Sequence, residues 1–142
     1  MRILSFPDGF TSSSAPLVEG AGSQENFVIN NNATAVELLT IDSAQYKSYF
    51  IDYELIRQDV GGVYVQQGGI ILGYDGSDWA ITFGNYQGVD LIQDSSGTID
   101  LPEKIKLYVT TSLGVCSLKY DSGAMGGSYS GELKLIITRV SV

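Results

Sequence analysis

Apolar and polar residues alternate along most of the chain after Gln24. In residues 49–55, Tyr49, Ile51, Tyr53 and Leu55 share one face of an extended chain, and Phe50 is an apolar exception on the other. The same alternation recurs at 79–83, 105–109 and 133–137. A period of two is the signature of half-buried strands. The pattern therefore predicts β-strands.

Turn residues separate these runs, and most of the 17 glycines lie among them. Asp-Gly and Gly-Gly pairs supply the positive φ angles that tight hairpins require. Turns are predicted at 30–32, 59–62, 67–69, 75–78, 84–85, 94–97, 121–123 and 126–128. The segments between them predict about nine or ten strands. These are expected near 25–30, 34–42, 46–58, 62–68, 70–75, 79–84, 88–93, 104–111, 115–121 and 129–140.

A helix is the competing interpretation for residues 33–50, but Val36, Leu39 and Tyr46 are only loosely helical in spacing, and the Thr and Ile content favours a strand. Short strands joined by Gly-rich turns are typical of a sandwich or barrel. A chain of 142 residues suits one domain with its own core. We therefore expect an all-β domain over residues 24–142.

Residues 1–23 differ from the rest of the chain, because they are rich in Ser, Pro and Gly and lack periodicity. A disordered tail is one interpretation. An extended N-terminal arm that orders against a partner is favoured, because a solvated tail has little need for six large apolar side chains. These are Ile3, Leu4, Phe6, Phe10, Leu17 and Val18.

The charge balance is acidic, with 16 Asp and Glu against 8 Lys and Arg and a net charge of -8. Phosphate contacts need clustered Lys and Arg, so nucleic acid is not expected as a partner. Anionic membrane surfaces are disfavoured for the same reason. No run of about 18 apolar residues exists, so no membrane insertion is predicted.

The sequence contains no histidine. This removes Ser-His-Asp and Cys-His catalysis together with the commonest general base. Asp52 and Glu54 lie on one side of a predicted strand and could act as an acid–base pair in glycoside hydrolysis. A solvated strand face is the favoured reading of this pair. The expectation is that the protein is not an enzyme.

Neither a metal nor a cofactor is expected. Cys116 is predicted to be a buried, inert thiol, because free cysteine is among the most buried residue types. A lone cysteine also suits a chain made in a reducing cytoplasm. Asp75 and Asp78 could offer oxygen ligands to calcium, but the 12-residue ligand pattern is missing and a hairpin turn is favoured.

Aromatic residues offer a route to binding without catalysis. Tyr64, Tyr74, Trp79 and Tyr86 lie near predicted turns in the middle of the chain. Such side chains stack on sugar rings or pack at protein interfaces. The favoured alternative is that Trp79 and most of the tyrosines belong to the core or to a subunit interface.

Residues 31–57 contain an Asp-Ser pair at 42–43 and the run Phe-Ile-Asp-Tyr-Glu-Leu-Ile-Arg at 50–57. On these residues, the segment resembles small domains of tailed-bacteriophage virion proteins, such as tail-fibre and decoration proteins. The other pieces follow in order at 68–72, 88–89, 105–110 and 131–139, and the Gly-rich segment at 121–131 is longer than that pattern. The similarity is specific only at 42–57, and its motif carries no catalytic residue.

This resemblance implies an antiparallel β-sandwich of jelly-roll type that assembles as a homotrimer with other phage virion proteins. It implies a virion location, after assembly in the host cytoplasm. The first functional expectation is a tail-fibre or baseplate-associated protein, docked by the arm, whose partners include a host-surface glycan. Two alternatives stay open: a capsid cement or decoration protein that clamps neighbouring capsomers, and a carbohydrate-binding module.

Overall fold

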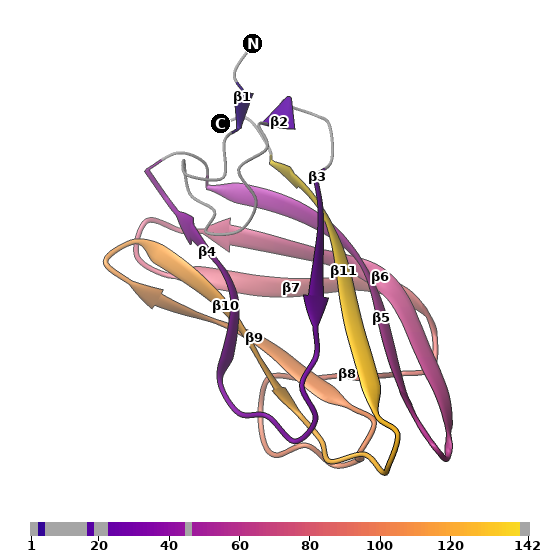
Figure 1. The fold of residues 1–142 in the computed structure, drawn as a ribbon. Coiled ribbons are helices and arrows are strands. Elements are labelled where there is room, and N and C mark those ends of the chain that lie inside the picture. Colours follow the sequence, from indigo (N-terminus) through magenta and orange to yellow (C-terminus); the bar gives the residue numbers. More distant parts are fainter. Residues whose placement is uncertain (1–2, 5–16, 19–22, 45–46, 140–142) are drawn as a thin grey trace.

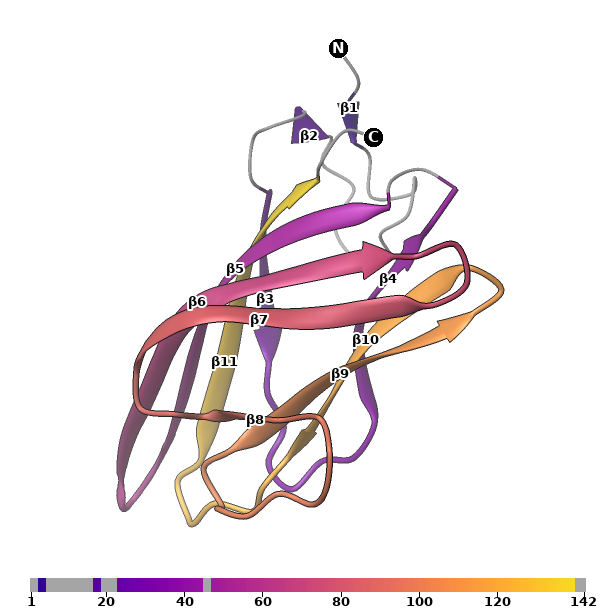
Figure 2. The same cartoon turned by 180° about the vertical axis from the view of Figure 1, so that it is seen from behind.

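The computed structural model describes residues 3–4, 17–18, 23–44 and 47–139. Two packed sheets make up the fold (Figures 1 and 2). One has five strands in the order β3-β11-β5-β6-β7, and the other has four in the order β4-β10-β9-β8. The strands are β3 (Ser23–Val28), β4 (Val36–Asp42), β5 (Ser48–Asp59), β6 (Gly62–Tyr74), β7 (Trp79–Gly88), β8 (Ile92–Gln93), β9 (Ile105–Ser112), β10 (Val115–Ser122) and β11 (Ser130–Arg139).

The predicted all-β sandwich is confirmed. The chain passes between the sheets after β3, β4, β7 and β10, and every strand pair is antiparallel except the short β8–β9 pair. No helix occurs in the described part of the chain, and β4 and the start of β5 occupy the segment where a helix competed. Two short strands, β1 (Ile3–Leu4) and β2 (Leu17–Val18), pair with each other separately.

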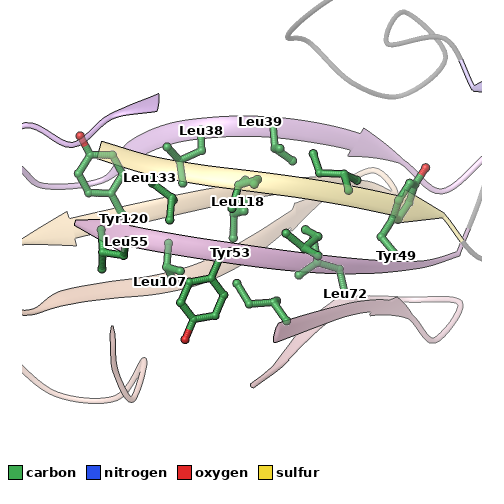
Figure 3. Close-up of a cluster of buried hydrophobic side chains, with 14 of the residues drawn as sticks. Leu38, Leu39, Tyr49, Tyr53, Leu55, Leu72, Leu107, Leu118, Tyr120 and Leu133 are labelled. Carbon is green, nitrogen blue, oxygen red and sulfur yellow. The ribbon is translucent and has the colours of Figure 1, made fainter. Parts of the chain in front are cut away.

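The core lies between the two sheets, where the alternating apolar residues meet (Figure 3). The inward face of β5 contributes Tyr49, Ile51, Tyr53 and Leu55, all buried. Leucines from both sheets cover them, and several of these are fully shielded from solvent. Burial of one such side chain contributes about 1.5–3 kcal/mol. The alternation in the sequence thus correctly predicts which side chains of β5 face the core.

The predicted turn at 67–69 is wrong, because β6 runs without a break from Gly62 to Tyr74. The two strands expected at 62–68 and 70–75 are one strand, paired with β5 along its whole length. Gly68 and Gly69 instead lie at an irregularity in the pairing of β6 with β7. Glycine accommodates such a bulge because it tolerates the local twist. For the same reason Gly84 and Asn85 lie inside β7 and not in a turn.

Arg57 is the last buried residue of β5, with no part of its side chain exposed. Its Nη1 donates hydrogen bonds to the carbonyl oxygens of Pro102 at 3.0 Å and Lys104 at 3.1 Å. Its Nη2 donates to the carbonyl oxygen of Gly123 at 2.9 Å, and its Nε donates to the Tyr129 hydroxyl at 3.1 Å. The guanidinium group therefore ties the five-stranded sheet to the connections on either side of β9 and β10.

The β9–β10 hairpin turns through Leu113 and Gly114, whose φ angles are 51° and 79°. Positive φ at both positions is the geometry that favours Asn-Gly. Leucine occupies the first of them, and its side chain is fully exposed, so no packing compensates for the backbone strain. We expect Leu113→Asn to raise the free energy of unfolding by ~1 kcal/mol, because leucine is strained in the left-handed region. Urea unfolding measures this. Val60→Asn, at an exposed hairpin position without positive φ, should bring no such gain, and a less stable Leu113→Asn would contradict the prediction.

Candidate functional site

A small pocket of about 140 Å³ lies where β7 and β8, the edge strands of the two sheets, follow one another along the chain. We call it the edge pocket. Figure 2 shows β7 and β8 facing the viewer at this edge. Side chains from both sheets line it: Tyr53, Gln66, Phe83, Tyr86, Ile92, Gln93 and Asp94, together with the backbone of Gly84.

Gln66 lies at the back of the edge pocket and is 1% exposed. Its Oε1 accepts hydrogen bonds from the backbone N–H groups of Leu91 at 2.7 Å and Ile92 at 2.8 Å. Because an oxygen must occupy that position, the amide orientation is fixed and Nε2 carries two N–H donors. Among the described residues, none accepts a hydrogen bond from this Nε2. Buried donors are normally satisfied, so this one requires water or a ligand.

Tyr53 reaches the edge pocket from β5. Its ring lies directly over Gly68, where a Cβ would stand 2.6 Å from the Tyr53 hydroxyl oxygen. Figure 3 shows Tyr53 as part of the buried cluster, and its side chain is only 6% exposed. Burial raises the pKa of Tyr53 to about 12, with further contributions from Asp90 and Tyr86. The phenol is therefore a neutral hydrogen-bond donor at physiological pH, and no described residue accepts from it.

Two further rings complete the edge pocket. Phe83 and Tyr86 on β7 are 36% and 47% exposed. Asp94 also lines the pocket, and its Oδ1 accepts a hydrogen bond from the Ser96 backbone N–H at 3.1 Å. The pocket thus combines exposed aromatic surface with donors and a carboxylate, which is the composition expected of a small-ligand site.

A second hollow, of about 370 Å³, lies on the outer face of the five-stranded sheet. Asp52 and Glu54 both line it, as their spacing predicts. Glu54 is already engaged, because its Oε2 accepts a hydrogen bond from Gln67 Nε2 at 2.7 Å and its Oε1 lies 4.0 Å from Lys134 Nζ. These contacts make Glu54 part of a polar cluster on the sheet face.

Apolar side chains flank this hollow on the same outer face. Phe50 on β5 pairs directly with Ile71 on β6. On the other side of β5, Ile136 of β11 pairs with Asp52, two residues along the strand from Phe50, and so lies diagonally from Phe50 on the same face. Their exposed fractions are 49%, 42% and 39%. Toward the other end of the sheet, Ile56 pairs with Val65. We call the cluster of Phe50, Ile71 and Ile136 the outer apolar patch.

Four aromatic residues were singled out from the sequence, and the structure distributes them between the core and the edge pocket. Trp79 is buried, and its Nε1 donates to the Gly114 carbonyl oxygen at 2.9 Å. The ring of Tyr74 lies 5.5 Å from that of Trp79, and Tyr64 is partly buried against the core. Tyr86 lies in the edge pocket.

The six residues assigned to the arm are only partly described. Phe6 and Phe10 lie outside the described residues. In the backbone pairing of β1 with β2, Ile3 faces Val18 and Leu4 faces Leu17.

Sequence reasoning did not single out Tyr53, Gln66 or Phe83 as site residues. Tyr53 and Phe83 share the inward parity of core residues, and Gln66 appears in the sequence as an ordinary polar strand residue. The feature that could have identified the edge pocket is the alignment of three residues across neighbouring strands, because Tyr53 pairs with Gly68 and Gly68 pairs with Tyr86. That feature requires the register of β6, which the predicted turn at 67–69 obscured.

The remaining candidate chemistry is structural. Cys116 is fully buried, and burial raises the pKa of its thiol to about 12. Asp75 Oδ1 accepts hydrogen bonds from the backbone N–H groups of Ser77 and Asp78, both at 2.8 Å, which holds the predicted hairpin turn. In the described part of the chain, no group of three His, Cys, Asp or Glu residues is placed to hold a metal ion. The described part of the chain also contains no helix that is long and apolar enough to cross a membrane.

The chain matches no known protein-family model and no curated protein sequence. Among solved structures, it is similar to the tailspike protein of Acinetobacter baumannii phage AM24, with 12% sequence identity and a TM-score of 0.35. The match covers 84% of this chain and 28% of the tailspike chain, so this chain spans little more than a quarter of that protein.

Proposed function

We propose that the protein is a non-enzymatic structural component of a tailed-phage virion, in particular a tail-fibre or baseplate-associated protein that assembles as a homotrimer. The outer face of the five-stranded sheet would be the surface through which copies meet. The resemblance at residues 42–57 supports the virion role, and the outer apolar patch carries the assembly role.

The two outer faces of the sandwich differ in a way that supports assembly. The four-stranded sheet presents polar side chains, including Lys106 and Asp121, whose Nζ and Oδ2 atoms lie 3.4 Å apart. The five-stranded sheet presents Phe50, Ile71 and Ile136 to solvent. Single exposed apolar residues are ordinary, but a contiguous group rimmed by polar residues marks an interaction surface.

A second copy of the chain is the favoured occupant of this surface. The hollow beside the outer apolar patch carries both signs of charge, from Asp52, Glu54 and Lys134. Copies related by symmetry can therefore place a lysine of one opposite a carboxylate of the next, around a central apolar contact. Closed symmetry is the usual arrangement of identical subunits, and residues at the centre of such a contact supply most of its energy.

The test is the mass of the full-length chain measured by multi-angle light scattering. We expect a trimer for the natural sequence and a monomer for the double variant Phe50→Ser and Ile71→Ser, because central apolar contacts are each worth about 2 kcal/mol or more. Tyr86→Ala removes a ring of similar exposure on another surface and should leave the trimer intact.

A natural chain that stays monomeric at every concentration would overturn the assembly proposal, as would a double variant that remains trimeric. Labelled antibodies against the protein, viewed on intact particles, separate the tail location from the capsid location of a cement protein. Decoration confined to the capsid shell would replace the tail-fibre proposal.

A further inference from the structure

We propose that the edge pocket binds one neutral pyranose ring, as the terminal residue of a glycan, with Gln66 Nε2 and the Tyr53 hydroxyl donating to its oxygens and Tyr86 packing on its face. This goes beyond the proposed assembly role and rests on different residues.

The inference rests on two hydrogen-bond donors, Gln66 Nε2 and the Tyr53 hydroxyl, that have no acceptor among the described residues. Gln66 is almost entirely buried, and its Oε1 is held by two backbone N–H groups. Its Nε2 is therefore fixed in place and has no acceptor among the described residues, and Gln66 lines the edge pocket. Tyr53 also lines this pocket, and no described residue accepts a hydrogen bond from its hydroxyl group. Two donors that no described residue satisfies, one of them held in a fixed orientation, favour a ligand rich in acceptor oxygens.

The rest of the lining narrows the class of ligand. Phe83 and Tyr86 offer aromatic surface, on which the apolar C–H face of a pyranose packs. The carboxylate of Asp94 can accept from a ligand hydroxyl. Sugar hydroxyls both donate and accept, so they match this mixture of donors and carboxylate. A ligand with only one of these capacities would leave part of the lining unpaired.

The size and the charge of the edge pocket restrict the class of ligand further. A pocket of about 140 Å³ is well below the roughly 300–1,000 Å³ of sites that enclose a drug-sized ligand, which limits the enclosed part to one ring. Among the described residues that line the pocket there is no Lys or Arg, whereas Asp94 is one of them, and Asp90 acts electrostatically on Tyr53. Uronic and sialic acids would meet this negative charge, so a neutral sugar is preferred.

The experiment is a titration of the full-length ¹⁵N-labelled protein with four neutral methyl glycosides: those of glucose, galactose, mannose and N-acetylglucosamine. We expect at least one to shift the Gln66 side-chain NH₂ signals, with a dissociation constant in the millimolar range that suits a single ring. The methyl glycoside of glucuronic acid should bind more weakly than that of glucose.

Three variants sharpen the test. Tyr86→Ala should weaken binding about tenfold, which corresponds to the loss of about 1.4 kcal/mol. Leu101→Ala is the matched control, because Leu101 has the same exposed fraction as Tyr86 and lies outside both the edge pocket and the outer apolar patch, and it should leave the affinity unchanged. Tyr53→Phe removes a hydroxyl that no described residue accepts from, so it should weaken binding while the protein stays as stable as before.

The inference is overturned if no neutral glycoside shifts the Gln66 side-chain signals, or if Tyr86→Ala and Leu101→Ala weaken binding equally. These outcomes leave the assembly proposal untouched, because light scattering of the same variants reports the trimer independently. Conversely, a monomeric chain that binds a glycoside through Tyr86 would refute the assembly proposal and sustain the sugar site.

Discussion

Replacing Arg57 with alanine should lower the free energy of unfolding by about 3–5 kcal/mol, because it removes several hydrogen bonds to a charged group, each worth about 1.5–3 kcal/mol, and leaves a cavity in the interior. The guanidinium group donates to three backbone carbonyl groups and to Tyr129. Loss of the side chain removes these hydrogen bonds and leaves a cavity in the interior. It also removes the contacts that join the C-terminal end of β5 to the connection before β9. Urea unfolding of the full-length chain measures the change.

Arg57→Lys and Arg57→Met separate the contributions. Lysine keeps the charge but lacks the planar fork of five donors, so it cannot reach the carbonyl oxygens of Pro102 and Gly123 together with the Tyr129 hydroxyl. Methionine restores much of the volume and none of the donors. We expect both variants to be less stable than the natural protein and more stable than Arg57→Ala.

Lys134→Ala is the control for charge removal. Lys134 pairs with Glu54 at 4.0 Å on a partly exposed face, and such pairs are worth about 0–1 kcal/mol. If Arg57→Ala costs no more than this control, the buried network does not hold the two sheets together in the way its geometry indicates.

Arg57 also shows how far the sequence alone reaches. It has the same parity as Tyr49, Ile51, Tyr53 and Leu55, so the alternation already places its side chain on the inward face. What the sequence does not provide is the set of acceptors, because they come from connections more than 40 residues away along the chain. The position of a side chain follows from local periodicity, whereas its partners depend on the packing of the whole fold.

The edge pocket illustrates the same division. The alternation predicts β5 and β7, but Gln66 becomes a buried donor only because the backbone of Leu91 and Ile92 crosses over it. Gly68 suggests a turn when it is considered with Gly69 alone. In the fold, the same glycine leaves room for the Tyr53 ring, which a side chain at that position would displace. Glycine thus has two uses that local sequence does not distinguish.

Gly88→Ala should lower the free energy of unfolding by about 3 kcal/mol or more, because it combines two costs. The φ angle of Gly88 is +104°, and a Cβ there would overlap the carbonyl oxygen of Val65. Left-handed strain contributes about 1–2 kcal/mol, and overpacking contributes about 1–3 kcal/mol. Chemical unfolding gives the total.

Gly76→Ala is the matched control, because Gly76 has nearly the same φ, +100°, and no atom of the described residues lies within 4 Å of its Cβ position. It should show the strain alone, so the difference between the two variants isolates the clash with Val65. Gly88 also leads the chain from β7 toward Leu91 and Ile92, whose N–H groups hold Gln66. Gly88→Ala should therefore also shift the Gln66 side-chain NH₂ signals in the absence of sugar, whereas Gly76→Ala should not. Equal losses of stability with unchanged Gln66 signals would mean that this connection does not set the shape of the pocket.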